Sequence, residues 1–181
     1  MSTTRRSPTA RSKARRGPFG ATRYVASLPL VDIDWLVGEG VRLVLLDRDN
    51  TCVPRDAAQA PAEVLDWLER ARAAGLSLWL VSNNFHSSQV GRTARELGVN
   101  VVDHAMKPAP FALRRAMRRA GVGPEATVMI GDQVFTDVVA GNLAGVRTVL
   151  VRPQSRRDLW YTHVFRVFER LALLGISFDG E

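Results

Sequence analysis

The fold of this chain is decided by the stretch Val41-Arg42-Leu43-Val44-Leu45-Leu46-Asp47-Arg48-Asp49-Asn50-Thr51. It begins as a short run rich in Val and Leu, which suits a strand buried on both faces of a parallel sheet. The run stops at Asp47, because Asp, Asn and Thr are poor strand residues and favour turns. Ligands of open α/β sheets bind just beyond the carboxyl ends of the strands. We therefore expect a site where this strand ends.

The two carboxylates of this stretch, Asp47 and Asp49, stand two residues apart. Neighbouring carboxylates repel each other, and such a pair persists where a cation binds or where one acid keeps its proton. One acid could then be a nucleophile and the other a proton donor and acceptor, with a hard cation between them. The alternative is a polar turn that only ends a strand, and this stretch alone does not decide between the two.

Strands and helices alternate along the rest of the chain, which predicts an α/β fold with a Rossmann-like parallel sheet and helices on both faces. Residues 24–36 read as a lead-in segment that ends in a short helix. The predicted strands cover 41–46, 76–81, 99–102, 127–130 and 148–151. The predicted helices cover about 32–37, 61–74, 86–97, 108–120, 134–143 and 158–174.

Polar residues end three of the predicted strands, and the carboxyl ends of parallel strands lie at one edge of a sheet. One such end is an ordinary turn, whereas three together with a nearby lysine indicate a site. The converging residues are Asp47 and Asp49, Ser82 and Asn83, Asp132, and Lys107 at the start of a helix.

Oxygen ligands of this kind suit a hard divalent cation such as Mg²⁺, held by Asp47, Asp132 and a loop carbonyl at or near Asp49. A cation beside a carboxylate nucleophile indicates a phosphoryl substrate, whose charge the metal would neutralise. Ser82 and Lys107 could hold the other phosphate oxygens. Asp137 could support the site by holding Lys107 or a metal-bound water, or could be only a first-turn charge of its helix.

These residues resemble the four ordered motifs of the haloacid dehalogenase (HAD) superfamily of aspartate-nucleophile phosphatases, over about residues 41–151. Within it, the chain is similar to the YqeG-type subfamily IIIA phosphatases, which are related to mitochondrial phosphatidylglycerophosphate phosphatases, and this similarity reaches from about Leu28 to the final helix. The four motifs are Asp47-x-Asp49-x-Thr51, Ser82, Lys107-Pro108 and Gly131-Asp132-x-x-x-x-Asp137. The finer similarity is carried by Asp-Asn-Thr, Val-Ser-Asn-Asn and Gly-Asp-Gln-x-x-Thr-Asp-Val-x-x-Gly-Asn.

The resemblance implies a Mg²⁺-dependent phosphomonoester hydrolase. Asp47 would attack phosphorus and form an aspartyl-phosphate, and Asp49 would protonate the leaving group and then activate water. Lys107 would share in catalysis and in phosphate binding. The implied phosphate-binding set is Thr51, Ser82, Asn83 and Lys107, the implied metal set is Asp47, Asp49 and Asp132, and Asp137 is the supporting residue.

The chain departs from the family pattern at two positions. Arg48 replaces a commoner apolar residue, and it could help to bind an acidic substrate or could simply be solvated. Cys52 replaces a commoner Leu, and we expect a small buried thiol there rather than a reactive one. It is the single cysteine of the chain, which excludes an internal disulfide framework and a multi-cysteine zinc site.

Many HAD enzymes carry a cap domain over the site, and the spacing here leaves no room for one. About 25 residues separate Thr51 from the second strand, and about 22 lie between Asn84 and Lys107. A helix and a strand already occupy these intervals. An open site favours a bulky substrate, such as a lipid head group, a protein or a nucleic-acid end.

The net charge of +7 over 181 residues is unevenly placed, because residues 1–16 hold six positive charges and no acid. We expect residues 1–20 to form a disordered basic tail and 21–181 a single domain, whose near-neutral body does not favour nucleic acid as a partner. The tail could touch anionic lipid or nucleic acid, or act as a transit peptide, although a solvated tail is favoured.

No apolar run is long enough to span a bilayer, so we expect a cytoplasmic protein, with peripheral membrane contact compatible with its tail. The oligomeric state is not predicted. A rival hypothesis is a non-catalytic protein of the same fold that binds RNA, ribosomes or lipid through the tail.

Overall fold

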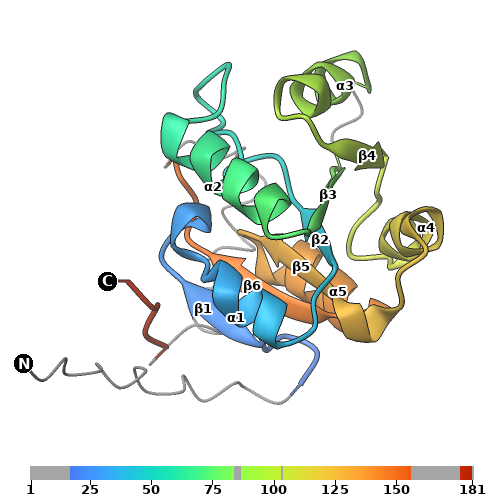
Figure 1. The fold of residues 1–181 in the computed structure, drawn as a ribbon. Helices are drawn as coiled ribbons and strands as arrows, with labels where there is room; N and C mark the ends of the chain where they lie inside the picture. The colour runs from blue at the N-terminus through green and yellow to red at the C-terminus, as the bar shows by residue number, and fades with distance from the viewer. Residues whose placement is uncertain (1–16, 84–86, 103, 156–175, 181) are drawn as a thin grey trace, which may run out of the picture.

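The computed structural model describes residues 17–83, 87–102, 104–155 and 176–180, which form one six-stranded parallel sheet with helices on both faces (Figure 1). The strand order is β1-β6-β5-β2-β3-β4. The strands are β1 (Arg23–Val25), β2 (Leu43–Leu46), β3 (Ser77–Val81), β4 (Asn100–Val102), β5 (Thr127–Gly131) and β6 (Arg147–Val151). The helices are α1 (Ile33–Gly38), α2 (Ala62–Ala73), α3 (Ser87–Glu96), α4 (Phe111–Ala120) and α5 (Val139–Ala144), with short helical turns η1 (Leu28–Leu30), η2 (Pro124–Ala126) and η3 (Val134–Val138).

Strand β2 lies at the centre of the sheet, between β5 and β3, and all four of its residues are buried. Its apolar sequence is explained by this position, because a central parallel strand is covered on both faces. In the register, Leu46 lies beside Ile130 on one side and Leu80 on the other. The backbone N–H of Asp47 still donates to the Ile130 carbonyl at 2.9 Å, and the chain then leaves the sheet as predicted.

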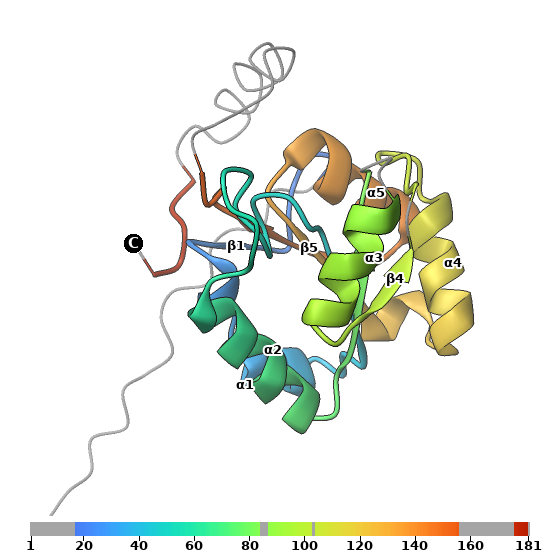
Figure 2. The same cartoon turned by 90° about the horizontal axis from the view of Figure 1, so that it is seen from above.

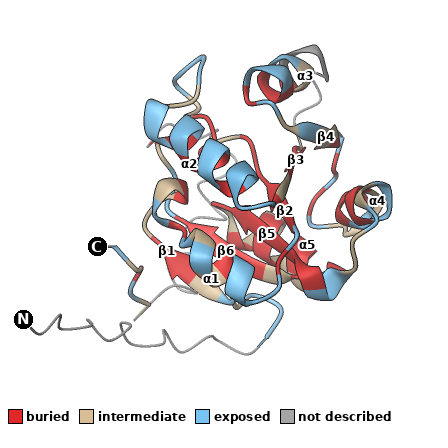
Figure 3. Ribbon diagram, viewed as in Figure 1, coloured by how far each residue is buried: buried red, intermediate tan, exposed pale blue. Residues whose placement is uncertain are grey.

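Alternate side chains of the strands feed two layers of core, since successive strand residues point to opposite faces. Val44 and Leu46 face a core that also holds apolar residues of α1, α2 and α3. Leu43 and Leu45 face the other core, which holds the buried stripes of α4 and α5. Figure 2 shows α1 and α2 on one side of the sheet, with α4 on the other, and Figure 3 shows the buried strands between them.

The sequence did not predict strand β1, which extends the edge of the sheet by pairing with β6. It comes from the lead-in segment, where three residues are too few for a clear alternating pattern. The Tyr24 ring is buried and packs edge-on against Phe178 at 5.7 Å between centroids. The backbone of Asp179 donates to the Tyr24 carbonyl at 2.9 Å, so residues from near the end of the chain fix this strand.

Two predicted helices have different bounds in the structure. Helix α4 begins at Phe111 rather than 108, because Pro108 and Pro110 occupy the approach to it. The segment predicted as one helix over 134–143 is a π-helical turn, η3, followed by α5, which ends at Gly145 in the left-handed conformation (φ 80°). The final helix predicted over 158–174 and residues 1–16 of the tail predicted over 1–20 lie outside the described residues.

No inserted domain stands in the two intervals where a cap would occur, as far as the described residues go. A loop joins β2 to α2, and α3 alone, with short connections, joins β3 to β4. None of the described helices has the length and apolar character to cross a membrane. At the start of the described chain, Asn142 of α5 donates to the carbonyls of Pro18 and Gly20 at 2.8 and 3.1 Å.

Candidate active site

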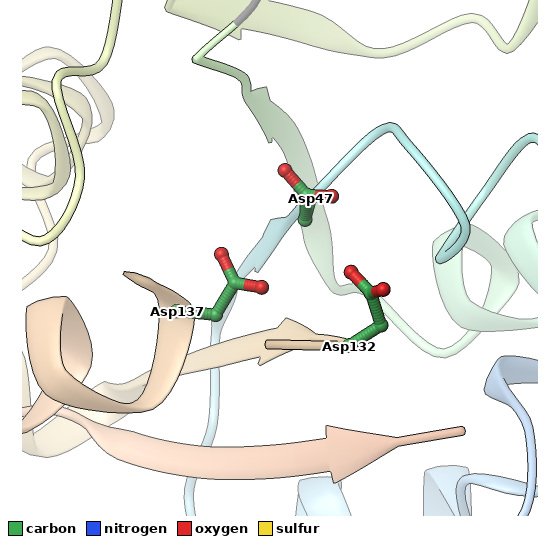
Figure 4. A group of neighbouring side chains, drawn as sticks. All are labelled: Asp47, Asp132 and Asp137. Carbon is green, nitrogen blue, oxygen red and sulfur yellow. The ribbon is translucent and has the colours of Figure 1, made fainter. Parts of the chain in front are cut away.

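Three buried carboxylates gather beyond the ends of β2 and β5. Asp47 directly follows β2, Asp132 directly follows β5, and Asp137 lies in η3 (Figure 4). Each offers one oxygen, and these oxygens lie within 4.8 Å of one another. The structure thus brings together residues that stand up to 90 positions apart in the sequence. The convergence expected at the carboxyl edge of the sheet is present for Asp47 and Asp132.

Lys107 supplies the positive charge of this cluster. Its Nζ donates to Asp47 Oδ1 at 2.6 Å and to Asp137 Oδ1 at 2.7 Å, and all three side chains are buried. Burial alone would lower the pKa of Lys107, but the charges of Asp137 and Asp47 outweigh it and raise the pKa above its ordinary value. The lysine is therefore held as a cation between the two acids.

The backbone of Lys107 is fixed by Asn83, which follows β3. The Lys107 N–H donates to Asn83 Oδ1 at 2.8 Å, and Asn83 Nδ2 donates to the Lys107 carbonyl at 3.0 Å. We predicted that the Asn83 side chain binds phosphate. In the structure its amide group is bonded to the backbone of Lys107 and helps to position the lysine. Ser82 is buried beside it, and its backbone carbonyl accepts from the Ala105 N–H at 3.0 Å.

Three carboxylates around one lysine leave the cluster short of positive charge. Burial, opposed by Lys107 and reinforced by Asp137 and Asp49, raises the pKa of Asp47 to about 7. Burial, together with Asp47 and Asp137, also raises the pKa of Asp132 well above its ordinary value. A bound divalent cation would reverse this effect, since an opposite charge favours the ionised carboxylate.

The oxygen atoms of the cluster are of two kinds, those already engaged in hydrogen bonds and those that could coordinate a metal ion. Both oxygens of Asp137 have partners, because Oδ1 accepts from Lys107 and Oδ2 accepts from the Gln133 N–H at 3.1 Å. Asp132 Oδ1 is buried and has no hydrogen-bond partner among the described residues. A buried orphan oxygen beside two further carboxylates fits the hard, oxygen-only coordination of Mg²⁺.

Gly131, the last residue of β5, is required by the close approach of Asp137. A Cβ atom at this position would lie 2.2 Å from Asp137 Oδ2, well inside van der Waals contact. Any side chain here would displace the acid that holds Lys107. The glycine before Asp132 therefore has a steric role in the site rather than a conformational one.

Asp49 lies apart from the three gathered carboxylates. Its Oδ1 accepts from the Arg48 guanidinium, and Arg48 Nε donates to Thr93 Oγ1 of α3 at 3.1 Å. Arg48 is only 6% exposed, so it is not the solvated side chain that was one alternative. The chain Thr93–Arg48–Asp49 fixes the direction of the second acid. The role of Asp49 as a metal ligand remains a prediction.

A tight loop after Asp49 holds Asn50 and Thr51. Asn50 adopts the left-handed conformation (φ 60°), and its Oδ1 accepts from the Arg55 N–H at 3.1 Å and from Ser155 Oγ at 2.8 Å. Thr51 is fully buried, and its Oγ1 has no partner among the described residues. Gln154 Nε2 donates to the Thr51 carbonyl, so the segment after β6 braces this loop.

The sequence did not reveal several of these supporting contacts. Thr93, Gln154 and Ser155 reach the site from distant parts of the chain, and nothing in their local sequence marks them. Gln133 directly follows Asp132, at the turn into η3. A backbone N–H at such a turn is a plausible donor to Asp137, so this contact could have been expected from the sequence. Cys52 is buried as predicted, and burial, followed by the nearby Asp47, raises the pKa of its thiol.

Comparison with known proteins places the chain in a family. The family model Hydrolase_like, described as "HAD-hyrolase-like", matches residues 104–163. The chain is 34% identical over 162 residues to the probable phosphatase YqeG of Bacillus subtilis, covering 90% of this chain and 94% of that protein. It is 29% identical over 151 residues to phosphatidylglycerophosphate phosphatase 1, chloroplastic/mitochondrial, of Arabidopsis thaliana, covering 75% of this chain and 42% of that protein.

A solved structure has the same fold. The cobalt-bound deoxy-D-mannose-octulosonate 8-phosphate phosphatase of Haemophilus influenzae superposes with a TM-score of 0.52 at 18% identity, covering 75% of this chain and 89% of that one. The parallel sheet, the gathered carboxylates and the near full-length match to a relative agree with one another. The chain belongs to the YqeG-type phosphatases of the HAD superfamily.

Proposed function

We propose that this protein hydrolyses phosphate monoesters in the presence of Mg²⁺, with Asp47 as the nucleophile. The observation that carries the proposal is the cluster of Asp47, Asp132 and Asp137, whose oxygens lie within 4.8 Å, with Lys107 Nζ 2.6 Å from Asp47. The Lys107 ammonium group holds the Asp47 carboxylate at the end of a buried strand. The carboxylate therefore has little rotational freedom, which favours attack on phosphorus from one direction.

The reaction would proceed in two steps. Asp47 attacks phosphorus, the bond to the leaving alkoxide breaks, and Asp49 gives that alkoxide a proton. A water molecule then attacks the aspartyl-phosphate, Asp49 takes its proton, and Asp47 and inorganic phosphate are released. Lys107 offsets negative charge near Asp47 throughout, and Thr51 and Ser82 are the proposed phosphate contacts.

Mg²⁺ would be held by Asp47, Asp132 and the backbone at Asp49, and when bound it would neutralise charge on the phosphoryl oxygens. The unpartnered Asp132 Oδ1 supports its place in this set. Asp137 supports the site through Lys107, because both of its oxygens are already used.

The proposed substrate is a bulky or lipid-linked phosphate monoester, and phosphatidylglycerophosphate is its sharpest form. The Arabidopsis relative bears that substrate in its name, and no cap-sized insertion occurs in the described intervals. We also propose that residues 21–181 act as one phosphatase domain in the cytoplasm, at the periphery of a membrane, with residues 1–20 as a basic tail. Nucleic acid is not a proposed substrate of the folded domain.

Hydrolysis of p-nitrophenyl phosphate by the wild type and Asp47→Asn, with Mg²⁺ or EDTA, tests the chemistry. We expect Mg²⁺-dependent turnover that falls by about 10³-fold or more in the variant, because the nucleophile is lost. Turnover that persists in EDTA or in Asp47→Asn would contradict the proposal. No turnover on any phosphate monoester would favour the rival hypothesis of a non-catalytic binding protein.

A substrate panel tests the proposed substrate class separately. The panel compares phosphatidylglycerophosphate, other lipid phosphates in mixed micelles, a phosphopeptide and small sugar phosphates. We expect kcat/KM to be highest on the lipid phosphates. A clear preference for sugar phosphates would overturn this part of the proposal and leave the chemistry intact.

A further inference from the structure

Two exposed apolar side chains flank the lysine of the site. Met106 precedes Lys107 and is 70% exposed, and Phe111 begins α4 and is 72% exposed. They are the most exposed large apolar side chains among the described residues. Lys107 between them is buried against Asp47. Two exposed apolar side chains therefore stand on either side of Lys107 in the chain, within four residues of it.

The backbone at Met106 adds to this observation. Its φ of 52° lies in the left-handed region, where glycine is the usual residue. Packing does not account for a long apolar side chain at this position, because the side chain is exposed. Turn geometry does not account for it either, because the left-handed conformation favours glycine. A surface that receives the side chain would account for it.

Helix α4 continues the same surface with positive charge. Its buried stripe is Ala112, Leu113, Ala116 and Met117. The opposite side of the helix carries Phe111 and, at helical spacing, the arginines at 114, 115, 118 and 119. From His104 to Pro124 the chain contains no acid, and within the described part of the chain no carboxylate forms a salt bridge with Arg118 or Arg119.

We propose that Met106, Phe111, Arg118 and Arg119, called here the α4 surface, dock the protein on an anionic lipid bilayer. The arginines would lie at the charged head groups, and the two apolar side chains would enter the interface beside the site. The α4 surface would thereby bring Asp47 to phosphate groups at the bilayer. The inference deepens the proposed function, and it rests on that function only for what is hydrolysed there.

The chemistry of the α4 surface favours a bilayer over RNA. Arginines alone would serve either partner, since both carry phosphates. Single-stranded RNA is bound through aromatic rings that stack on bases, and Met106 has no ring to offer. A bilayer interface accepts apolar side chains with or without a ring, next to arginines at its surface.

Vesicle sedimentation with the full chain tests the docking. The vesicles are phosphatidylcholine alone or phosphatidylcholine with 30% phosphatidylglycerol, and the partition coefficient is measured for each variant. We expect wild type to prefer the anionic vesicles. Met106→Ser with Phe111→Ser, and separately Arg118→Gln with Arg119→Gln, should each lower the partition coefficient about tenfold.

Matched variants control for charge and for apolar area. Arg42→Gln with Arg70→Gln removes the same charge from exposed positions at the other end of β2 and on α2. Leu30→Ser with Val37→Ser removes two other exposed apolar side chains. Both control pairs should bind within about twofold of wild type. Thermal unfolding midpoints of all variants show that each one is folded.

The basic tail is present in every variant, so its contribution to vesicle binding is constant. If the α4 variants bind like wild type, or if the control pairs lose as much binding, the α4 surface does not dock and the proposal is overturned. The proposal is also overturned if the α4 variants lose binding to a single-stranded RNA but bind the vesicles like wild type. Turnover of p-nitrophenyl phosphate by wild type tests the proposed function independently of these results.

Insertion itself has a separate signal. In Phe111→Trp, an indole replaces the exposed ring, and brominated lipids quench indoles that enter the acyl region. On anionic vesicles, we expect the tryptophan fluorescence of Phe111→Trp to be quenched more than that of wild type, which has four native tryptophans. Equal quenching in the two proteins would contradict insertion of residue 111.

Discussion

At the scale of single residues, the site is a problem of charge balance. Lys107 holds Asp47 and Asp137, while Asp132 keeps an oxygen without a partner among the described residues. Burial penalises each ionised carboxylate, and one lysine does not compensate three of them. The arrangement is therefore least stable when every acid is charged and no cation is bound.

This balance predicts a pH-dependent stabilisation by Asp132→Asn. The folded-state pKa of Asp132 is raised, so the folded protein binds more protons than the unfolded chain above about pH 4, and stability falls as pH rises through that window. Asn does not ionise. In EDTA, the variant should unfold a few degrees higher than wild type at pH 8, and this difference should shrink toward pH 5.

Calorimetry or circular dichroism melting measures the effect. Addition of Mg²⁺ should reverse the order at pH 8, because the wild type gains stability from binding the ion and the variant lacks a ligand. A variant that is less stable than wild type in EDTA at both pH values would contradict this account of Asp132.

A second prediction concerns Arg48 as a positioning residue for Asp49. Thr93→Val removes the acceptor of Arg48 Nε and keeps the size of the side chain. We expect kcat to fall about three- to tenfold with KM little changed, because a misdirected Asp49 affects proton transfer more than binding. Steady-state kinetics over pH 5–9 measures this, and Thr93→Ser, which restores the hydroxyl, should recover most of kcat. A Thr93→Val enzyme with a raised KM alone would place Arg48 in substrate binding instead.

At the scale of elements, the turn from β5 into η3 determines where Asp137 lies. The Asp137 N–H donates to the Gln133 carbonyl at 2.9 Å, four residues back. The Val138 N–H donates to the same carbonyl at 3.3 Å, and this five-residue span is the wide winding of a π-helical turn. This winding brings Asp137 over Gly131, so close that no Cβ fits between them. The π turn is thus part of the site, as such turns often are.

Gly131→Ala should consequently displace Asp137 and weaken the Lys107 pair. We expect a loss of about 1–3 kcal/mol in the free energy of unfolding, typical of overpacking in a buried site, and at least a tenfold fall in kcat. Urea unfolding and turnover measure the two effects. Gly141→Ala, at an equally crowded position within α5, is the matched control and should lose stability with a smaller effect on kcat. Equal losses of kcat in the two variants would show that Gly131 matters only for packing.

How much of this was predictable depends on the range of the interactions. The acids Asp47 and Asp132 could be placed from the sequence because each ends an apolar strand, and parallel strands end at one edge. Lys107 was expected at the start of a helix, but α4 begins only at Phe111, and the lysine is positioned instead by the contacts of its backbone with Asn83. The Thr93–Arg48 contact and the Ser155–Asn50 contact join segments more than 40 residues apart, and local patterns carry no information about them.

The same reasoning explains the errors at the element scale. Strand β1 has only three residues, and it is held by β6 and by Asp179, so its own sequence gives little signal. The predicted helix over 134–143 has correct apolar spacing, but that spacing does not reveal the π turn at its start. Tertiary contacts decide both cases.

At the scale of the whole molecule, the order of the strands determines which parts can move independently. Strand β2 is hydrogen-bonded on both sides, while β1 and β4 have one neighbour each in the sheet. Hydrogen exchange should therefore be slowest for the amides of Leu43–Leu46 and require global unfolding, whereas β1 and β4 should exchange through local opening. Mass spectrometry measures the exchange of each segment. If the amides of β2 exchange as fast as those of the edge strands, this order is contradicted.

The central place of β2 has a consequence for how such a protein can diversify. A substitution that shifts the nucleophile would disturb two strand pairings at once, so inherited changes there would mostly be lost with the whole fold. The loop from His104 to Pro110 lies outside the sheet and carries Lys107 into the same site. Ala105 and Lys107 are buried in it, whereas positions such as Met106 are exposed, and replacements at the exposed positions cost little in folding. New preferences for one phosphate ester over another should accordingly accumulate at those exposed positions. A library randomised there, with Ala105 and Lys107 kept, should yield altered selectivity while the hydrolytic step is retained.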